Sequence, residues 1–306
     1  MYTKYIQVLR KDIGFKMGNS MNEISMKAYA KINLGLDVVR RLENGYHEVK
    51  MIMQTVGIYD ELTFQRQESG ICITTDSGEL PTNEDNLIYK AARLLMDKYQ
   101  LQEGVRIHLQ KNIPIAAGMA GGSTDAAATF KGINELFGLG ASEDELKELA
   151  VKVGADVPYC IMGGTALAEG IGEKLTRLPN APECILLVAK PDINVSTKFV
   201  YEHLDAAGVE HHPDIDGMIT AIEEQDLVGV VDRLENVLET VTVPAYPIID
   251  TIKSKMLEMG AEGSLMSGSG PTVFGIFTDE GKAREAYEYI KSEGLAKQVF
   301  VTGFCS

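Results

Sequence analysis

The stretch IPIAAGMAGGSTDAA, residues 113–127, runs from a glycine-rich loop directly into a helical pattern. Its alanine and glycine residues would let a ligand approach the backbone closely. Ser123, Thr124 and Asp125 are candidate N-caps, and apolar residues follow them at helical spacing. Because the first turn of a helix offers unpaired N–H groups and partial positive charge, this stretch predicts a phosphate-binding loop. Taken alone, such a stretch is better explained as a flexible surface loop before an ordinary amphipathic helix.

The common phosphate and hydrolase motifs do not match this chain. The nearest approach to a Walker A loop, at Gly281-Lys282, lacks the first glycine and the Ser or Thr that should follow the lysine. The dinucleotide fingerprint G-x-G-x-x-G does not fit the spacing of Gly118, Gly121 and Gly122. The nucleophile elbow G-x-S-x-G fails because its second glycine is absent. The phosphate hypothesis survives, and three common folds are excluded.

Composition and charge restrict the partners of the chain. The 306 residues are 45% hydrophobic and 24% charged, which is typical of a globular enzyme with room for two domains. The net charge is −15, with acidic residues spread along the sequence. Such a charge repels nucleic acids and anionic membranes, so we expect neither as a partner. A phosphate site here would work through local N–H groups, a few lysines and a metal ion.

The cysteines and the apolar runs favour a cytoplasmic protein. Four cysteines are widely spaced without a C-x-x-C pair, which indicates reduced thiols rather than disulfides or a zinc site: Cys72, Cys160, Cys184 and Cys305. No apolar run is long enough to span a membrane. Residues 1–21 lack the continuous apolar segment of a signal peptide, and we treat them as an N-terminal extension outside the core fold.

Hydrophobic periodicity indicates mixed strands and helices. Apolar residues alternate from 28 to 38, which predicts a half-buried strand with Lys31 and Asn33 together on its polar face. The turn signal Asn44-Gly45 leads to a second strand at 49–56, and Ser142 with Glu145 forms a capping-box pattern. Further strands are predicted at 105–109, 185–189 and 273–277, and further helices at 85–99, 247–259 and 281–292. This mixture predicts α/β or α+β layers, with a domain boundary near residue 180.

Three more segments carry residues suited to chemistry. Residues 29–33 place a lysine on a strand, residues 154–159 place Asp156 between a helix end and a proline, and residues 266–272 form a second glycine-rich turn. Each has an ordinary reading when taken alone: a solvated lysine, a turn or capping aspartate, and a flexible turn. Their joint occurrence with the loop at 113–127 favours one shared site.

In this order and spacing, the four segments resemble the motifs of the GHMP kinase superfamily, which includes galactokinase, homoserine kinase and mevalonate kinase. The resemblance covers nearly everything from residue 26 to 306. The chain is most similar to the branch whose substrate is methylerythritol linked to cytidine diphosphate. Five stretches point to that branch: AKINL at 30–34, NGYH at 44–47, EDNLI at 84–88, AGGSTDAA at 120–127 and GADVP at 154–158.

The resemblance implies a two-domain α+β architecture with the active site in the cleft between the domains. Residues 22–180 would form a ribosomal-protein-S5-domain-2-like N-terminal ATP-binding domain, and residues 181–306 a ferredoxin-like C-terminal domain. The implied activity is ATP-dependent phosphorylation of the substrate's 2-hydroxyl in the non-mevalonate (MEP) pathway of isoprenoid precursor biosynthesis. ATP and Mg²⁺ are the expected cofactors, and we expect a monomer or weak homodimer.

Roles for single residues follow from the same resemblance. Asp156 would accept or orient the hydroxyl proton, and Lys31 would stabilise negative charge on Asp156 and on the transferring phosphoryl group. Asn86 would lie near the adenine. The loop would hold the ATP phosphates through a continuous run of residues: Pro114, Ile115, Ala116, Ala117, Gly118, Met119, Ala120, Gly121, Gly122, Ser123 and Thr124. Which of the hydroxyls of Ser123 and Thr124 lies on the metal side stays open, and Asp125 should point away from the nucleotide.

The cytidine end of the substrate would contact Asn33, Tyr46, His47 and Tyr201. An aromatic ring can stack on a pyrimidine, and an imidazole can form hydrogen bonds with its polar edge. Two other functions remain possible at this stage. One is a related kinase acting on homoserine or a mevalonate derivative. The other is a catalytically silent ligand sensor on the same scaffold, which would be expected to lack Lys31 or Asp156.

Overall fold

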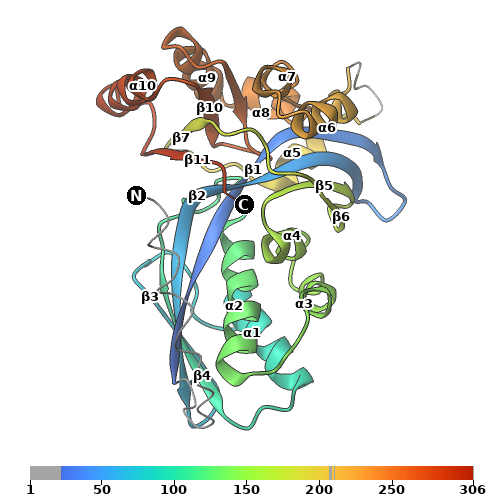
Figure 1. Cartoon of the computed structure of the whole chain (residues 1–306), viewed down its shortest axis with the longest axis vertical. Helices are drawn as coiled ribbons and strands as arrows, with labels where there is room; N and C mark the ends of the chain where they lie inside the picture. The colour runs from blue at the N-terminus through green and yellow to red at the C-terminus, as the bar shows by residue number, and fades with distance from the viewer. Residues whose placement is uncertain (1–21, 207–208, 210, 306) are drawn as a thin grey trace, which may run out of the picture.

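A long hairpin forms the frame of the molecule. In the computed structural model, which describes residues 22–206, 209 and 211–305, β1 (Glu23–Arg41) pairs antiparallel with β2 (His47–Gln67). The turn predicted at Asn44-Gly45 is confirmed, because Asn44 Oδ1 accepts a hydrogen bond from the Tyr46 N–H at 3.0 Å. The expected extension at 1–21 lies outside the described residues. Both strands are much longer than the predicted 28–38 and 49–56, and they reach both halves of the structure (Figure 1).

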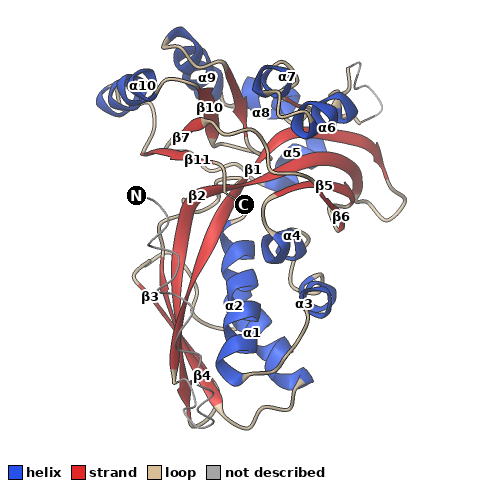
Figure 2. Ribbon diagram, in the orientation of Figure 1, coloured by secondary structure: helices blue, strands red, loops and turns tan. Residues whose placement is uncertain are grey.

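The hairpin belongs to a seven-stranded sheet with helices on one face (Figure 2). The main strand order is β3 (Ile71–Thr75), β4 (Gly104–Gln110), β2, β1 and β8 (Glu235–Asn236), and β5 (Thr165–Gly170) pairs with β2 and with β6 (Lys174–Arg177). Four helices accompany this sheet: α1 (Leu87–Lys98), α2 (Gly121–Phe137), α3 (Glu143–Ala150) and α4 (Val157–Met162). Phe64 and Ile107 of the sheet share a core with Phe130 of α2.

The C-terminal half has its own four-stranded antiparallel sheet. Its order is β11 (Gln298–Gly303), β7 (Ile185–Lys190), β10 (Val273–Phe277) and β9 (Gly263–Met266). Helix α9 (Ile248–Glu258) precedes β9, and α10 (Glu280–Ser292) joins β10 to β11. Four shorter helices fill the β7–β9 connection: α5 (Thr197–His203), α6 (Ile215–Glu223), α7 (Leu227–Val231) and α8 (Glu239–Ala245). This β-α-β-β-α-β pattern confirms the predicted ferredoxin-like arrangement.

The two sheets pack against each other over the middle of the hairpin. Ile32 and Leu34 of β1 lie in one core with Leu186 of β7 and Phe274 of β10. Every residue from 30 to 38 is buried, including those on the other face of the strand, and the prediction of a half-buried strand is wrong. The alternating pattern describes one face correctly, but the second face is covered by segments distant in sequence, which periodicity cannot reveal.

The position of the domain boundary stays a prediction. The sheets change between β6 and β7, on either side of the expected residue 180. However, β8 returns to the first sheet and pairs in parallel with β1 at Gly35 and Leu36. Among the described residues, no helix is long and apolar enough to cross a bilayer.

One predicted helix cap is confirmed and another is wrong. Ser142 Oγ accepts from the Glu145 N–H at 3.2 Å, which confirms the Ser142 cap of α3. Helix α2, in contrast, begins at Gly121, and its N-cap is Ala120 in the left-handed region, with φ 57°. Ser123, Thr124 and Asp125 therefore lie inside the first turns of the helix. Side-chain preference favoured them as caps, but the loop reaches the helix through a backbone turn instead.

Candidate active site

The predicted phosphate loop connects β4 to α2 and opens its backbone toward a cavity. Ala116, Gly118 and Ala120 all have positive φ, between 52° and 71°. No side chain caps α2, so the N–H groups of its first turn are not used by a capping oxygen. Gly121 and Gly122 have no Cβ that would block an approaching ligand. Free N–H groups at the start of a helix are suited to bind phosphate oxygens.

The second glycine-rich turn, residues 266–272, holds the phosphate loop from the other side. Ser267 Oγ donates to the Gly118 carbonyl at 3.0 Å, and a Cβ on Gly118 would lie only 2.3 Å from the Ser267 carbonyl oxygen. The turn is itself fixed by Asn236, whose Nδ2 donates to the carbonyls of Met266 and Gly268, each at 2.8 Å. A glycine at 118 is therefore required by close backbone approach as well as by φ.

The structure separates the roles of the two hydroxyls that the sequence left open. Thr124 Oγ1 donates to the Tyr29 carbonyl at 2.7 Å, and the threonine side chain is buried. Ser123 lines the cavity, whereas Thr124 does not. Ser123 is therefore the hydroxyl placed to meet a ligand, and Thr124 ties α2 to β1.

Lys31 and Asp156 lie close to each other in the wall of the cavity. Lys31 Nζ lies 4.0 Å from Asp156 Oδ2, and it donates to Asn33 Oδ1 at 2.8 Å. The Lys31 side chain is 7% exposed and that of Asp156 is 33% exposed. Asp156 occupies the N-cap position of α4 without accepting a hydrogen bond there, so its carboxylate is not used by the helix. A buried cation beside an open carboxylate is suited to a reaction that moves a proton and develops negative charge.

One cavity of about 1090 Å³ brings the four sequence segments together. It is lined by nearly all of the predicted site residues: Lys31, Asn33, Tyr46, His47, Asn86, Pro114, Ile115, Ala116, Ala117, Gly118, Ala120, Gly121, Gly122, Ser123, Asp156 and Tyr201. Met119 and Thr124 do not line it. Met119 packs in the core, and its carbonyl accepts from the Lys31 N–H at 3.2 Å. These two residues shape the loop rather than its open surface.

Aromatic residues gather at the hairpin end of the cavity. The rings of His47 and Tyr201 lie 5.1 Å apart at an interplanar angle of 36°, although they are far apart in sequence. Burial, with a smaller effect of the Arg41 charge, lowers the pKa of His47 below its usual value, so the imidazole is neutral near pH 7. Burial raises the pKa of Tyr201 to about 12, and its hydroxyl remains a hydrogen-bond donor. Tyr46 is 60% exposed at the rim.

Asn86 lines the cavity but already has structural partners. Its Oδ1 accepts from the Ile88 N–H at 2.9 Å and caps α1, while its Nδ2 donates to the Pro81 carbonyl at 2.7 Å. Its place near the adenine stays a prediction, and these hydrogen bonds leave the amide little freedom to turn toward a ligand.

Sequence reasoning missed Lys111, which also lines the cavity. Lys111 Nζ pairs with Asp60 and lies 3.7 Å from Asp125 Oδ2. Its position directly before the loop was the available signal. Burial raises the pKa of the Asp125 carboxyl well above its usual value, an effect that the Lys111 charge opposes. Asp125 also lines the cavity, although it was expected to point away from the nucleotide.

Comparison with known proteins agrees with this geometry. The family model described as GHMP kinases N terminal domain matches residues 86–164, and the model described as GHMP kinases C terminal matches residues 218–296. The 4-diphosphocytidyl-2-C-methyl-D-erythritol kinase of Lachnospira eligens is 57% identical over 283 residues, which is 92% of this chain and 98% of that protein.

Solved structures give the same result. A crystal structure of 4-(cytidine 5'-diphospho)-2C-methyl-D-erythritol kinase superposes with a TM-score of 0.79 at 30% identity, covering 92% of this chain and 100% of that chain. Homoserine kinase from Cytophaga hutchinsonii has a TM-score of 0.75 at 21% identity, covering 94% of this chain and 95% of that chain, and it shares the fold. Because both family models match and a kinase relative is 57% identical over 92% of the chain, this chain belongs to the GHMP kinase family.

Proposed function

We propose that this chain transfers the γ-phosphoryl group of ATP to the 2-hydroxyl of 4-diphosphocytidyl-2-C-methyl-D-erythritol, a step of the non-mevalonate pathway of isoprenoid precursor biosynthesis. The single observation that carries the chemistry is the Lys31–Asp156 pair, which shares one cavity with the phosphate loop. The substrate assignment is supported by the 57% identity to a kinase of that name over nearly its whole length.

Asp156 and Lys31 divide the work of the transfer. The substrate hydroxyl loses its proton to Asp156 as its oxygen attacks the γ-phosphorus, and the bond from that phosphorus to the bridging oxygen of ADP breaks. Lys31 stabilises the charge that spreads over the transferring group, and Asn33 holds the lysine in place through the 2.8 Å hydrogen bond. Phosphoryl transfer depends mainly on positioning and charge stabilisation. The loop N–H groups would contribute to both by binding the ATP phosphates.

Mg²⁺ would enter with the nucleotide. Within the described ranges, no group of three or more His, Cys, Asp and Glu side chains is placed to hold a metal ion. The metal would therefore be bound largely by phosphate oxygens. The Ser123 hydroxyl, which lines the cavity, would be the protein ligand. Mg²⁺ prefers oxygen ligands of this kind. When bound, Mg²⁺ would neutralise charge on the phosphates.

The substrate's cytidine would occupy the hairpin end of the cavity. His47 and Tyr201 offer ring faces for stacking, and the neutral imidazole offers one donor and one acceptor to the pyrimidine. Tyr46, at the rim, would cover the base, and Asn33 lies deeper, beside Lys31. With the cytidine at that end, the reacting end of the substrate would lie next to Asp156.

Replacing His47 by alanine should raise the KM for the cytidyl substrate about tenfold or more, because hydrogen bonds and ring contact at the base are lost. The KM for ATP should stay within about twofold. Steady-state kinetics with each substrate varied in turn measures both. His203→Ala is the matched control, because His203 is exposed on α5. Equal changes in both KM values would contradict the cytidine assignment.

A substrate panel tests the function itself. ADP release from Mg-ATP should occur with the cytidyl substrate, and not with mevalonate, phosphomevalonate, homoserine or galactose. Turnover of another alcohol would support the kinase activity but contradict the substrate assignment. Folded protein that binds ATP but turns over none of the five would favour the sensor. The presence of both Lys31 and Asp156 in contact range argues against that alternative.

We extend the proposal to the setting of the enzyme. The cysteine pattern supports a cytoplasmic location, and the −15 charge supports the lack of nucleic acid or membrane partners. A monomer or weak homodimer is proposed from the family resemblance.

A further inference from the structure

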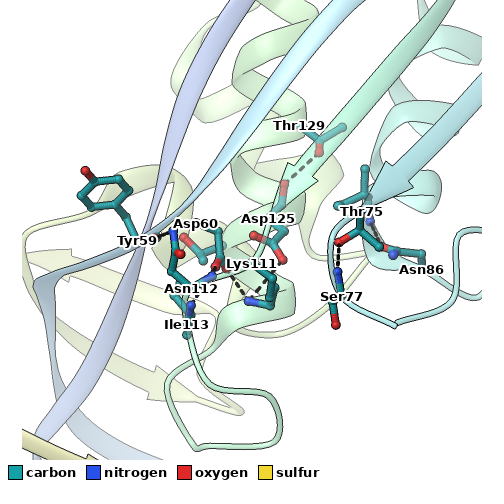
Figure 3. A network of polar contacts seen from close by, with 12 residues as sticks. Tyr59, Asp60, Thr75, Ser77, Asn86, Lys111, Asn112, Ile113, Asp125 and Thr129 are labelled. Atoms are coloured by element: carbon teal, nitrogen blue, oxygen red, sulfur yellow. Dashed lines mark hydrogen bonds and ion pairs between the residues drawn. The ribbon is translucent and has the colours of Figure 1, made fainter. Parts of the chain in front are cut away.

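A buried charged cluster lies behind the phosphate loop (Figure 3). At its centre is Asp60 of β2, which is 0% exposed. Asp60 Oδ1 accepts from the backbone N–H groups of Asn112 at 2.6 Å and Ile113 at 2.8 Å, and Oδ2 pairs with Lys111 Nζ. From the same position, Lys111 Nζ reaches to within 3.7 Å of Asp125 on α2.

The contacts of Asp60 fix the start of the loop. Strand β4 ends at Gln110, so the N–H groups of Asn112 and Ile113 have no neighbouring strand to bond with in the sheet. The Asp60 carboxylate replaces that partner, and charge-assisted hydrogen bonds of this type are strong. The direction in which the chain leaves β4 is therefore set by one side chain.

Lys111 extends this control to the far end of the loop. Asp125 lies in the first turns of α2, the helix that follows the loop, and Lys111 precedes the loop. The lysine side chain is only 7% exposed, so its contacts with the two carboxyl groups are little screened by water. Both ends of the segment 112–124 are thus attached to one charged group.

We propose that Asp60 and Lys111 are positioning residues of the phosphate loop, which hold its two ends at the separation that aims its N–H groups at the ATP phosphates. The inference rests on the proposed function only in taking ATP as the ligand. Neither residue needs to touch the reacting atoms. Their effect is to prevent the loop from relaxing when the cavity is empty, so that binding does not have to order it.

A graded set of variants tests this proposal. Asp60→Ala removes both the N–H acceptor and the charge, and Asp60→Asn keeps an oxygen for the N–H groups. Lys111→Met leaves Asp60 as the N–H acceptor but removes the ammonium that pairs with Asp60 and reaches Asp125. We expect the Kd for ATP to rise about tenfold or more in Asp60→Ala and less in the other two. Calorimetric titration with ATP alone measures this without turnover. The KM for the cytidyl substrate should stay within about twofold.

The matched control is Ile107→Ala, which opens the core under β4 without touching the cluster. It should lower Tm but leave the Kd for ATP unchanged. If the Asp60 variants lower Tm but raise the Kd for ATP no more than Ile107→Ala does, the cluster is only structural and the proposal is wrong. If both Asp60 variants fail to fold, an unchanged Kd in Lys111→Met overturns it. Because ATP binding is read separately, a failure of the cytidyl activity leaves this test intact.

Discussion

Asp156→Asn should lower kcat by about 10²- to 10⁴-fold, the range typical for the loss of a general base. Asparagine keeps the size and one oxygen of the side chain but cannot take up the hydroxyl proton. The fold should tolerate the change, because the Asp156 carboxylate caps no helix and its side chain is 33% exposed. The Kd for ATP should remain nearly constant, since the phosphates are held by the loop. Single-turnover kinetics and ATP titration measure the two effects.

Asp226→Asn provides the matched control for this variant. Asp226 also stands at an N-cap position without a side-chain hydrogen bond to its helix, α7, but it is exposed and does not line the cavity. It should keep full activity. If Asp156→Asn retained kcat within about threefold, Asp156 would have no part in proton transfer.

Lys31→Met should lower kcat by about 10²- to 10³-fold, as expected for the loss of a charge that stabilises the transition state. Methionine has a similar length and fills the buried space, so the effect is on charge rather than on volume. Asn33 Oδ1 loses its donor at 2.8 Å, and some loss of Tm should accompany the change. Steady-state kinetics beside thermal unfolding separates the two losses.

Lys27→Met is the control on the same strand. Lys27 is exposed, and its ammonium lies 4.2 Å from the centroid of the Tyr59 ring, away from the cavity. It should leave kcat unchanged. A Lys31→Met enzyme with normal kcat and only a lower Tm would show that the lysine is structural and does not stabilise charge in the reaction.

Local patterns in the sequence predicted many of the helices and strands but not how deeply their residues are buried. Alternation located the first strand, yet it gave Lys31 a solvated face, and the structure buries the lysine to 5% exposure. Its neighbour Asp156 comes from a segment more than a hundred positions later, and no local pattern encodes that packing. The same burial makes the lysine chemically useful, because the interactions of a buried charge are screened less by water.

Long-range pairs in the site had no signal in periodicity. His47 and Tyr201 were grouped only because of the family resemblance, and the structure brings their rings to 5.1 Å. In the sequence, Asp60 and Lys111 look like ordinary charged residues, which are solvated in most proteins. Their pairing depends on the register of β2 against β4, where Glu61 faces Gln110, and register is a tertiary property.

The backbone of the loop explains one further failure of prediction. Ala116 and Ala120 adopt φ values of 52° and 57°, a region in which residues other than glycine, asparagine and aspartate are uncommon. Sequence preference therefore pointed to Ser123, Thr124 and Asp125 as caps, in a normal extended entry to α2. The observed entry is strained, which is typical of segments that are held in place for ligand binding.

The short strand β8 limits how such kinases can be recombined. It lies late in the chain, yet its Asn236 side chain fixes the turn at 266–268 while its backbone pairs with Leu36 of the first sheet. A chimera joined at residue 180 would import a foreign edge strand into the native sheet and a foreign turn against Gly118. Exchanging substrate preference between family members therefore calls for grafting the walls of the cavity, because the two halves are not independent modules.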